Sequence, residues 1–320
     1  MIVVDAETVK SALPWRPLVE SLRAMFATGC TSPVRHHHEV GVPGEPDATL
    51  LLMPAWREGE LLGVKVAQVC PGNGDRGLPA VSASYLLNDA RTGRPLAVLD
   101  GGELTVRRTA AASALAADYL ARRDARTLLV VGTGRLAPCL AAAHCSVRQY
   151  DRILVWGRRP EKVAEIVSEL RGSDAEGVAG LEIGPVDTIE EGCAVADVIS
   201  VATLSSEPLI NGRWLRPGTH LDLVGAFKPT MRESDDECMR RARVYVDTLA
   251  GATKEAGDIV QAIQAGALTS GDIVADLFDL AGGRAAGRSD NGEITLFKSV
   301  GASLEDLAAA GLVWQSVRSS

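Results

Sequence analysis

The sequence predicts an α/β protein of two domains: a Rossmann dinucleotide-binding domain and an α+β domain built on an antiparallel sheet. Short, β-rich apolar segments separated by turns fill residues 33–100. Apolar strands alternate with helices over residues 113–294, which is typical of a parallel sheet covered on both faces. A glycine turn separates one of these strands from the next helix. The chain has 320 residues, more than one ordinary core accommodates.

The expected domain boundaries follow from this change of pattern along the chain. The antiparallel-sheet domain covers residues 1–112 and is completed by a strand, a turn and a helix at 295–320. The Rossmann domain covers residues 113–294. A long alanine-rich helix, LTVRRTAAASALAADYLARR, leads from one domain into the other.

The N-terminal segment 5–29 has the signals of a broken helix. Asp5 is a suitable N-cap, Pro14 and Pro17 interrupt and restart the helix, and Gly29 ends it. We therefore expect helical structure before the first strand of the antiparallel sheet.

Composition and charge exclude several classes of protein. The net charge is -8 and the pI is about 5.3, which argues against a nucleic-acid partner. No apolar run approaches the ~20 residues of a membrane span. The N-terminus MIVVDAETVK lacks the basic region and apolar core of a signal peptide. We expect a cytoplasmic protein without a membrane partner, with its six scattered cysteines reduced.

The segment TLLVVGTGRLA carries the cofactor signal. An apolar strand leads into Gly132-x-Gly134-x-x-Ala137, and a helix follows directly. Glycines at these positions let backbone N–H groups approach a pyrophosphate at the helix N-terminus. The predicted contacts of this turn are Gly132, Thr133, Gly134, Arg135 and Leu136. The alternative is a tight strand–helix turn without a ligand.

The next strand of this region ends in Gly157 and continues with Arg158 and Arg159. An NAD enzyme usually carries an acid here, which binds the ribose 2′-hydroxyl and repels a 2′-phosphate. Two arginines favour the phosphate, so we predict NADPH, with NADH as the second choice. Alternatively the arginines are solvated loop cations, or Glu161 reaches the ribose.

Three cations stand out: Arg35 before the histidines, Lys65 in the middle of an apolar strand and Arg108 at the start of an apolar helix. Buried cations are rare without partners, so their convergence would make a clamp for a substrate carboxylate. Each also has an ordinary interpretation. Lys65 could lie on the wet face of its strand, and Arg108 could pair at the surface with Asp118 or Asp124.

Three consecutive histidines, His36, His37 and His38, do not predict a metal site. On a strand only His36 and His38 share a face, and no acidic or thiol ligand stands nearby to complete a site. We expect a polar strand edge there and no metal.

Several segments, in order, resemble the ornithine cyclodeaminase/μ-crystallin family. They are LGVKV, LTVRRTAAAS, VVGTGRLA, VDTIEEGCAVADVISVAT, DLVGAFKPTMRE and ITLFKSVGASLEDLAAA. LTVRRTAAAS and ITLFKSVG are the most specific, and the match runs over nearly the whole chain. The family glycine turn often reads GAGVQA where this chain has GTGRLA, which changes the side-chain contacts expected there.

The resemblance implies a homodimer whose antiparallel-sheet domain binds substrate and dimerises. It implies that Arg35, Lys65 and Arg108 hold the substrate carboxylate. It also places further residues near the cofactor or substrate: Ser84, Thr109, Thr203, Val224, Gly225, Lys298 and Ser299.

Members of the family perform different reactions, and Phe227 bears on the choice between them. Cyclodeaminases of the family use an aspartate just after this glycine turn and an acid at the ribose, whereas this chain has Phe227 and two arginines. The loss of a general base typically costs 10²–10⁴-fold in rate. GAFxPxMRE is similar to the ketimine reductases, which reduce Δ1-pyrroline-2-carboxylate or Δ1-piperideine-2-carboxylate to L-proline or L-pipecolate.

Alternatives to ketimine reduction remain open from the sequence. They are an alanine-type amino-acid dehydrogenase, an ornithine cyclodeaminase, and a μ-crystallin-like protein that binds NADPH and a ligand. The proton donor to the imine is not identified, although Lys65 or Arg108 acting through water would be compatible.

Overall fold

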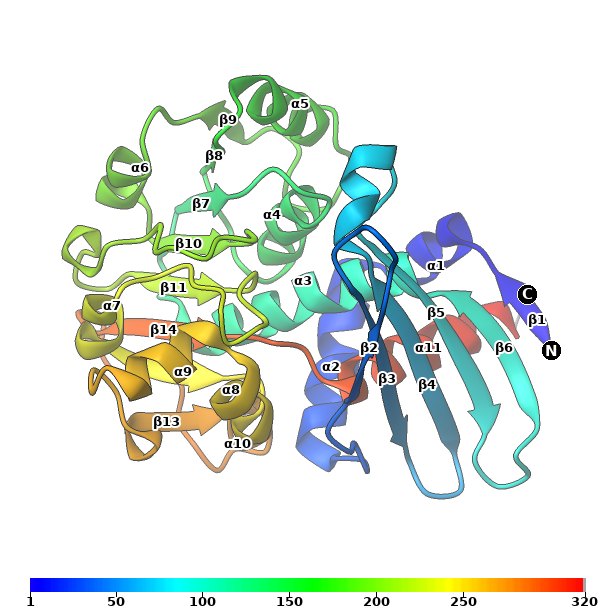
Figure 1. The fold of residues 1–320 in the computed structure, drawn as a ribbon. Helices are drawn as coiled ribbons and strands as arrows, with labels where there is room; N and C mark the ends of the chain where they lie inside the picture. The colour runs from blue at the N-terminus through cyan, green and yellow to red at the C-terminus, as the bar shows by residue number, and fades with distance from the viewer. Residues whose placement is uncertain (319–320) are drawn as a thin grey trace. The chain divides into compact units, whose positions relative to one another are not determined.

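The computed structural model describes residues 1–318 and divides into two compact units (Figure 1). The first unit comprises Met1–Arg108 and Ala302–Ser320, and the second comprises Thr109–Gly301. The sequence analysis placed residues 295–301 in the antiparallel-sheet domain, which corresponds to the first unit. The structure differs because the strand Ile294–Lys298 pairs inside the sheet of the second unit.

The first unit is built on a six-stranded sheet of order β1-β6-β5-β4-β3-β2. Its strands are β1 (Ile2–Val4), β2 (His36–Val40), β3 (Ala48–Trp56), β4 (Leu61–Val69), β5 (Val81–Asp89) and β6 (Pro95–Asp100). Neighbours from β2 to β6 are antiparallel, which confirms the predicted sheet. The sequence did not predict β1, which pairs in parallel with β6.

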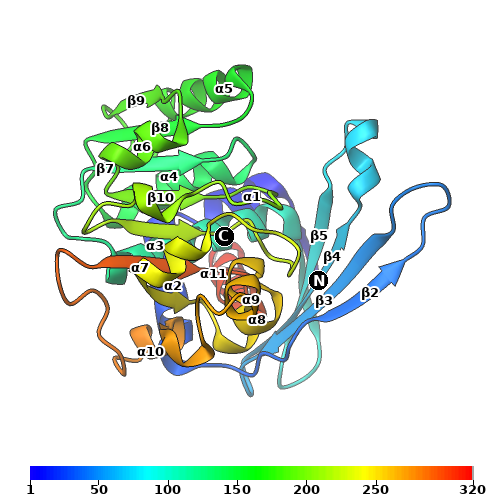
Figure 2. The ribbon, with the colours of Figure 1, turned by 60° about the vertical axis from the view of Figure 1, so that its left-hand side comes forward.

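Helices of the first unit cover one face of this sheet. They are α1 (Ala6–Ala12), α2 (Trp15–Thr28) and α11 (Ser303–Val317), with a 3₁₀ turn η1 (Pro71–Arg76). Asp5 accepts a hydrogen bond from the Thr8 N–H as the N-cap of α1, and α2 ends at Gly29, both as predicted. Helix α11 packs on β3 and β4 and runs beside α2 (Figure 2).

The two faces of the sheet differ in exposure because successive strand residues point to opposite sides. On β4, Lys65 and Ala67 are buried, whereas Val66 between them is exposed. Across the ladder, Lys65 pairs with Tyr85 and Val66 with Ser84. The face away from α11 therefore carries Val66 and Ser84, and the face toward α11 carries Lys65 and Tyr85.

The second unit is built on an eight-stranded sheet of order β13-β12-β14-β11-β10-β7-β8-β9. All its pairings are parallel. The strands are β7 (Thr127–Val131), β8 (Arg152–Trp156), β9 (Glu182–Pro185), β10 (Val198–Val201), β11 (His220–Leu223), β12 (Ala242–Val246), β13 (Ile273–Asp276) and β14 (Ile294–Lys298). This sheet confirms the predicted Rossmann-like architecture.

Helices connect these strands. Helix α3 (Gly101–Leu120) contains the division between the units. The others are α4 (Leu136–Val147), α5 (Pro160–Arg171), α6 (Ile189–Val195), α7 (Asp236–Arg241), α8 (Leu249–Glu255), α9 (Gly257–Gln264) and α10 (Leu277–Ala281), with 3₁₀ turns η2 (Gly212–Trp214) and η3 (Ser270–Asp272). None of the helices within residues 1–318 is both long enough and apolar enough to cross a membrane.

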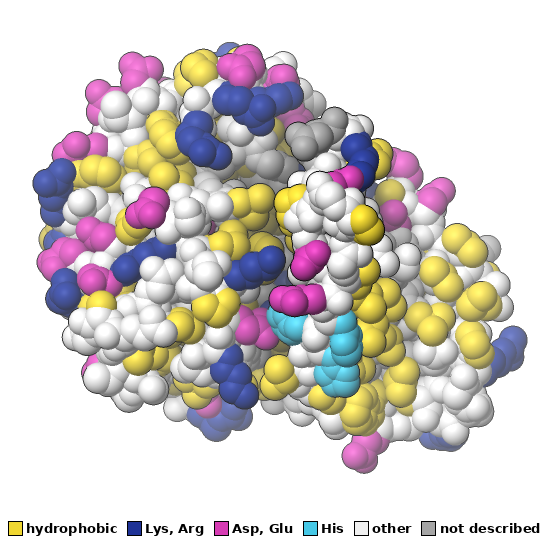
Figure 3. Space-filling model, in the orientation of Figure 1, with side chains coloured by type: hydrophobic (Ala, Val, Ile, Leu, Met, Phe, Trp, Pro, Cys, Tyr) yellow, Lys and Arg dark blue, Asp and Glu magenta, His cyan; other side chains and the backbone are white. Residues whose placement is uncertain are grey.

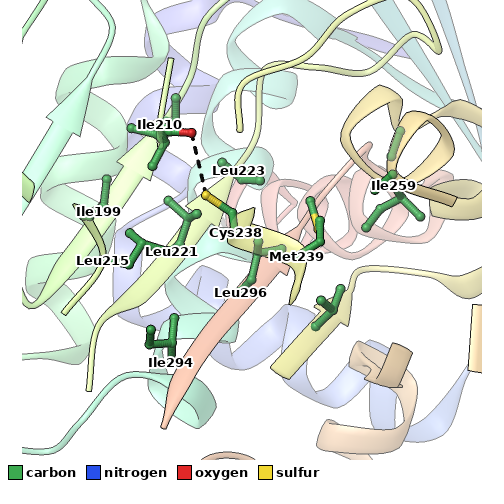
Figure 4. Close-up of a cluster of buried hydrophobic side chains, with 14 of the residues drawn as sticks. Ile199, Ile210, Leu215, Leu221, Leu223, Cys238, Met239, Ile259, Ile294 and Leu296 are labelled. Carbon is green, nitrogen blue, oxygen red and sulfur yellow. Dashed lines mark hydrogen bonds between the residues drawn. The ribbon is translucent and has the colours of Figure 1, made fainter. Parts of the chain in front are cut away.

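One apolar core of the second unit lies between the sheet and helices α6 to α9. Figure 4 shows Leu221, Leu223 and Leu296 of the central strands beside Cys238 and Met239 of α7. The alternate strand residues point to the other face, where polar groups are also buried. Asp222 there accepts hydrogen bonds from Ser113 of α3 and Ser200 of β10. Because the strands are parallel, the loops after β7, β10, β11 and β14 all leave from one edge of the sheet.

Candidate active site

The first unit contains a buried cluster of cations and acids. Lys65 is 2% exposed, and its Nζ lies 2.8 Å from both carboxylate oxygens of Asp306. Arg108 is 5% exposed and donates from Nε to Asp306 Oδ1 at 2.9 Å and from Nη1 to Glu305 Oε2 at 2.7 Å. Asp306 is thus shared by the ammonium and the guanidinium. The structure contradicts both ordinary interpretations of these cations, because neither Lys65 nor Arg108 lies at the surface.

The charges of this cluster act on one another strongly. Burial lowers the pKa of Lys65 to about 8, opposed by Asp306 and assisted by the positive charges of Arg108 and Arg35. Burial also disfavours the charge of Arg108, but the carboxylates of Asp306 and Glu305 outweigh it and raise the pKa of Arg108. Arg35 is half-buried and close enough to act on Lys65. All three predicted cations therefore contribute to one electrostatic cluster.

Glu305 and Asp306 are functional candidates that the sequence analysis missed. They lie in the first turn of α11, where the helix dipole favours acids, and both are fully buried. The signal was present in the sequence as a Glu-Asp pair inside the otherwise apolar stretch ASLEDLAAAGLVW. Buried acids on an apolar helix imply buried cationic partners.

The glycine turn after β7 has the geometry of a dinucleotide site. Gly132 has φ 129°, and a Cβ there would lie 2.5 Å from the carbonyl oxygen of Ala202, so only glycine fits. Gly134 is exposed, and apart from its chain neighbours no atom of residues 1–318 lies within 4 Å of its Cβ position. Helix α4 begins at Leu136. Within residues 1–318, the side chain of its N-cap residue, Arg135, makes no capping hydrogen bond to the first turn. The first N–H groups of α4 suit a phosphate.

The loops after β7 and β8 lie together. A Cβ on Gly157 would lie 2.5 Å from Cγ2 of Thr133, so Thr133 covers Gly157. Arg158 and Arg159, which follow Gly157, are both exposed. Two arginines therefore lie in the loop beside the glycine turn, where the ribose of a dinucleotide is expected.

The ends of β10 and β11 are joined by Glu233. Its Oε1 accepts hydrogen bonds from the N–H and hydroxyl of Thr203, at 2.7 and 2.9 Å. Its Oε2 accepts from the N–H groups of Gly225 and Ala226, at 2.7 and 3.2 Å. Val224, just before this turn, is buried. The sequence analysis did not select Glu233, because eight residues separate it from the turn it holds.

Phe227 follows this turn and is half-buried, with the Lys228 ammonium 5.9 Å from the ring centroid. The tip of β11 therefore presents an aromatic ring. The carboxylate nearest to the turn, Glu233, is engaged with backbone N–H groups.

The segment after β14 is also held by carboxylates. Asp247 Oδ2 accepts hydrogen bonds from the Ser299 hydroxyl at 3.1 Å and from the N–H groups of Val300 and Gly301, at 2.7 and 2.6 Å. Lys298 is fully buried, and its Nζ lies 3.2 Å from Asp258 Oδ2 and 3.6 Å from Glu233 Oε2. Lys298 and Ser299, both predicted to contact the cofactor, thus have carboxylate partners of their own.

Ser84 and Thr109 are two further predicted site residues. Ser84 is exposed on the outer face of β5, opposite to Lys65, so the structure does not bring it to the cations. Thr109 follows Arg108 on α3, is half-buried and belongs to the second unit.

The histidines of β2 form the cyan group at the surface in Figure 3. The rings of His36 and His38 are 6.4 Å apart between centroids. Among the described residues no group of three or more His, Cys, Asp or Glu side chains is arranged to hold a metal ion.

The sequence profile of the ornithine cyclodeaminase/mu-crystallin family matches residues 3–320. The chain belongs to this family. It is thus, by class, an NAD(P)-dependent oxidoreductase with a Rossmann-like fold, and the resemblance seen in its motifs is confirmed.

Relatives within the family have different named activities. The Δ(1)-pyrroline-2-carboxylate reductase of Paracoccus denitrificans is 38% identical over 302 residues, which cover 94% of this chain and 92% of the relative. The structure of Thermococcus litoralis Δ(1)-pyrroline-2-carboxylate reductase with NADH and L-proline has TM-score 0.93 and 34% identity, covering 100% of this chain and 98% of the other. An archaeal alanine dehydrogenase dimer with bound NAD has TM-score 0.90 and 29% identity, with coverage of 99% and 96%.

Proposed function

We propose that the chain is an NAD(P)H-dependent reductase of cyclic imine 2-carboxylates, acting on Δ1-pyrroline-2-carboxylate, Δ1-piperideine-2-carboxylate or both. The products would be L-proline and L-pipecolate. The observation that carries the proposal is the aromatic Phe227 at the tip of β11, beside Glu233, whose carboxylate accepts four hydrogen bonds. Phe227 thus stands where cyclodeaminases of the family carry an aspartate.

The cation cluster of the first unit supports a carboxylate substrate. Lys65, Arg108 and Arg35 carry three positive charges against the two negative charges of Glu305 and Asp306. The net charge of these five side chains is positive while Lys65 is protonated. A planar guanidinium can hold a carboxylate with two hydrogen bonds and so orient the ring attached to it.

The second unit suits a dinucleotide, through the open Gly134, the start of α4 and the exposed Arg158. When bound, a reduced nicotinamide supplies the hydride. The balanced reaction is imine plus NAD(P)H plus H⁺ giving the cyclic amino acid plus NAD(P)⁺. The imine nitrogen receives its proton from solution or from Lys65, whose lowered pKa makes it an acid near neutral pH.

The test is a spectrophotometric panel of NADPH and NADH with three substrates: Δ1-pyrroline-2-carboxylate, Δ1-piperideine-2-carboxylate, and pyruvate plus ammonium. We expect rapid oxidation of the reduced cofactor with a cyclic imine and slow oxidation with pyruvate. Faster turnover of pyruvate plus ammonium would instead indicate an alanine-type dehydrogenase. Proline formed from ornithine with catalytic NAD would indicate a cyclodeaminase, and tight NADPH binding without turnover a μ-crystallin-like binding protein.

The pH dependence should reveal the charge of Lys65. Its pKa of about 8 means that the ammonium is present below that pH and is lost above it. We expect kcat/KM for the imine to fall as the pH rises through about 8, because this parameter reports groups of the free enzyme. Lys65→Arg keeps its charge up to pH 10. If Lys65→Arg shows the same pH profile, titration of the imine itself explains the fall, and Lys65 is excluded as the cause.

Cofactor choice should depend on Arg158, which we propose contacts the 2′-phosphate of NADPH. Arg158→Ala should raise the KM for NADPH by about tenfold, the effect of one charge-assisted hydrogen bond, and leave that for NADH nearly unchanged. A suitable control is Arg123→Ala, because Arg123 is 82% exposed and precedes β7, at the other edge of the sheet. If Arg158→Ala raised the KM for both cofactors equally, the proposed contact with the 2′-phosphate would be wrong.

We also propose that the chain forms a homodimer through the outer face of the six-stranded sheet. Exposed apolar side chains gather on this face, including Val66 (38%) of β4 and Leu86 (37%) of β5. Figure 3 shows hydrophobic side chains beside the histidine group of this unit. Monomeric proteins rarely expose large continuous apolar surfaces.

Val66→Asp should convert the dimer to a monomer, because it buries an unpaired charge in the interface. Light scattering after gel filtration measures the mass. Val274→Asp is the matched control, because Val274 is 40% exposed and lies on β13 of the second unit. A Val66→Asp protein that stays dimeric would place the interface elsewhere.

A further inference from the structure

A fully buried trio of charged side chains lies at the carboxyl edge of the parallel sheet. Glu233 comes from the loop after β11, Asp258 from α9 and Lys298 from the end of β14. Each of the three residues is 0% exposed. Burying charges is costly unless they are paired, so their retention at this edge calls for an explanation.

The carboxylate of Glu233 acts as a bridge between two loops. Four donors share its two oxygens, two from Thr203 after β10 and two from the Gly225–Ala226 turn after β11. Only a deprotonated carboxylate can accept on both oxygens without placing its own proton against a donor. The position of Phe227, the next residue along, therefore depends on this carboxylate.

The other two residues hold Glu233 in place. Asp258 Oδ1 accepts from the N–H groups of Glu233 and Ser234, both at 2.9 Å, and from the Ser234 hydroxyl at 3.0 Å. Lys298 Nζ lies 3.2 Å from Asp258 and 3.6 Å from Glu233 and makes no hydrogen bond within residues 1–318. Its role in the trio is that of a counter-charge.

The charge balance of the trio leaves Glu233 easily protonated. Burial raises the pKa of Glu233 to about 7, with the Lys298 ammonium opposing the shift and the Asp258 carboxylate adding to it. Removing the ammonium would raise the pKa of Glu233 further, and the bridge would lose its second acceptor near neutral pH. Lys298 is thus connected to the two loops through the ionisation of Glu233.

We propose that Glu233 is the positioning residue for the nicotinamide half of the active site, and that Lys298 serves as its counter-ion and not as a cofactor ligand. The inference rests on the proposed function, because it requires the nicotinamide at the ends of β10 and β11. The Glu233 carboxylate holds the turn that carries Phe227 at a set distance from Thr203. Errors of about 1 Å in such an arrangement reduce rates by about 100-fold.

Glu233→Gln tests the proposal, because the amide keeps the size of the side chain but can accept hydrogen bonds on only one of its two terminal atoms. We expect kcat to fall by about 100-fold, as misplacement by ~1 Å would cause. The dissociation constant of NAD(P)H should change little, because the phosphate turn after β7 is untouched. The primary isotope effect with 4-deuterated NAD(P)H should increase as hydride transfer becomes rate-limiting.

Asp197→Asn is the matched control. Asp197 Oδ2 also accepts two backbone N–H groups, those of Arg126 and Thr127 at 2.8 and 3.0 Å, but at the amino edge of the sheet. We expect it to lower the melting temperature without a change in kcat or isotope effect. If Glu233→Gln behaves like this control, Glu233 is only structural and the proposal is wrong.

Lys298→Met tests the counter-ion role. If Lys298 acts only through Glu233, the double variant Lys298→Met with Glu233→Gln should be no slower than Glu233→Gln alone. A cofactor ligand would instead weaken NAD(P)H binding in Lys298→Met, independently of Glu233. Additive losses, or a loss confined to NAD(P)H affinity, would overturn this assignment.

Failure of the proposed function can be told apart from failure of this inference. A wild-type protein that reduces no imine and no keto acid refutes the function, but nicotinamide fluorescence of bound NAD(P)H still reports the ring environment. Glu233→Gln should then change the emission of bound NAD(P)H, and Asp197→Asn should not. Unchanged emission in Glu233→Gln would refute the positioning role by itself.

Discussion

Arg108→Ala should remove nearly all imine reduction and strongly destabilise the protein. The guanidinium is 5% exposed and bonds to both Glu305 and Asp306, so its loss takes a partner from two buried carboxylates. Breaking buried pairs in this way costs about 3–5 kcal/mol of unfolding free energy. This is a large part of the ~5–15 kcal/mol that holds a typical protein folded. Urea unfolding followed by circular dichroism measures it.

Activity should fall in the same variant for a separate reason, the loss of the carboxylate contact. Truncating one partner of a buried charge pair weakens binding by about 2–5 kcal/mol, which is roughly 30- to several thousand-fold in kcat/KM. Arg108→Ala combined with Glu305→Gln separates the two effects. The second change removes a buried negative charge and should recover part of the stability but none of the activity. Recovery of activity in the double variant would contradict the clamp.

Gly225→Ala should be the second most damaging substitution. A Cβ at this position would overlap the carbonyl oxygen of Thr203 and press on the Glu233 carboxylate. Backbone atoms cannot yield as a flexible side chain can, so the turns after β10 and β11 must separate. Overpacking of this kind costs about 1–3 kcal/mol of stability. Displacement of the turn by ~1 Å should lower kcat by about 100-fold.

Gly184→Ala provides the comparison for Gly225→Ala. Gly184 lies on β9 of the same unit, and apart from its chain neighbours no atom of the described residues lies within 4 Å of its Cβ position. We expect wild-type kcat and a melting temperature within a few degrees of wild type. If both glycine variants retain wild-type kcat, the spacing of the two turns has no influence on catalysis.

The sequence predicted the features that depend on neighbouring residues. The glycine turn needs only a strand, a few residues and a helix start, all within 127–147. Lys65 and Arg108 were recognisable because each is flanked by apolar residues. Their partners were not, because 241 residues separate Lys65 from Asp306 and 197 separate Arg108 from Glu305.

Features that the sequence could not predict depend on pairing across the chain. The face on which Ser84 lies is set by its register opposite Val66, and a shift of one residue would turn it to the other face. The apolar sequence of strand 294–298 is compatible with either sheet. Only its pairing with β11 and β12 assigns it to the second unit. The role of Glu233 depends on donors from two loops that local patterns do not bring together.

The discontinuity of the first unit has a consequence for biosynthesis. Its sheet is made early, but α11, the last of the described helices, supplies the acids for Lys65 and Arg108. The whole of the second unit, Thr109–Gly301, is translated in the meantime. Lys65 and Arg108 are therefore synthesised long before the two acids that pair with them. The buried ion pairs of the cation cluster can form only after Asp306 has been translated.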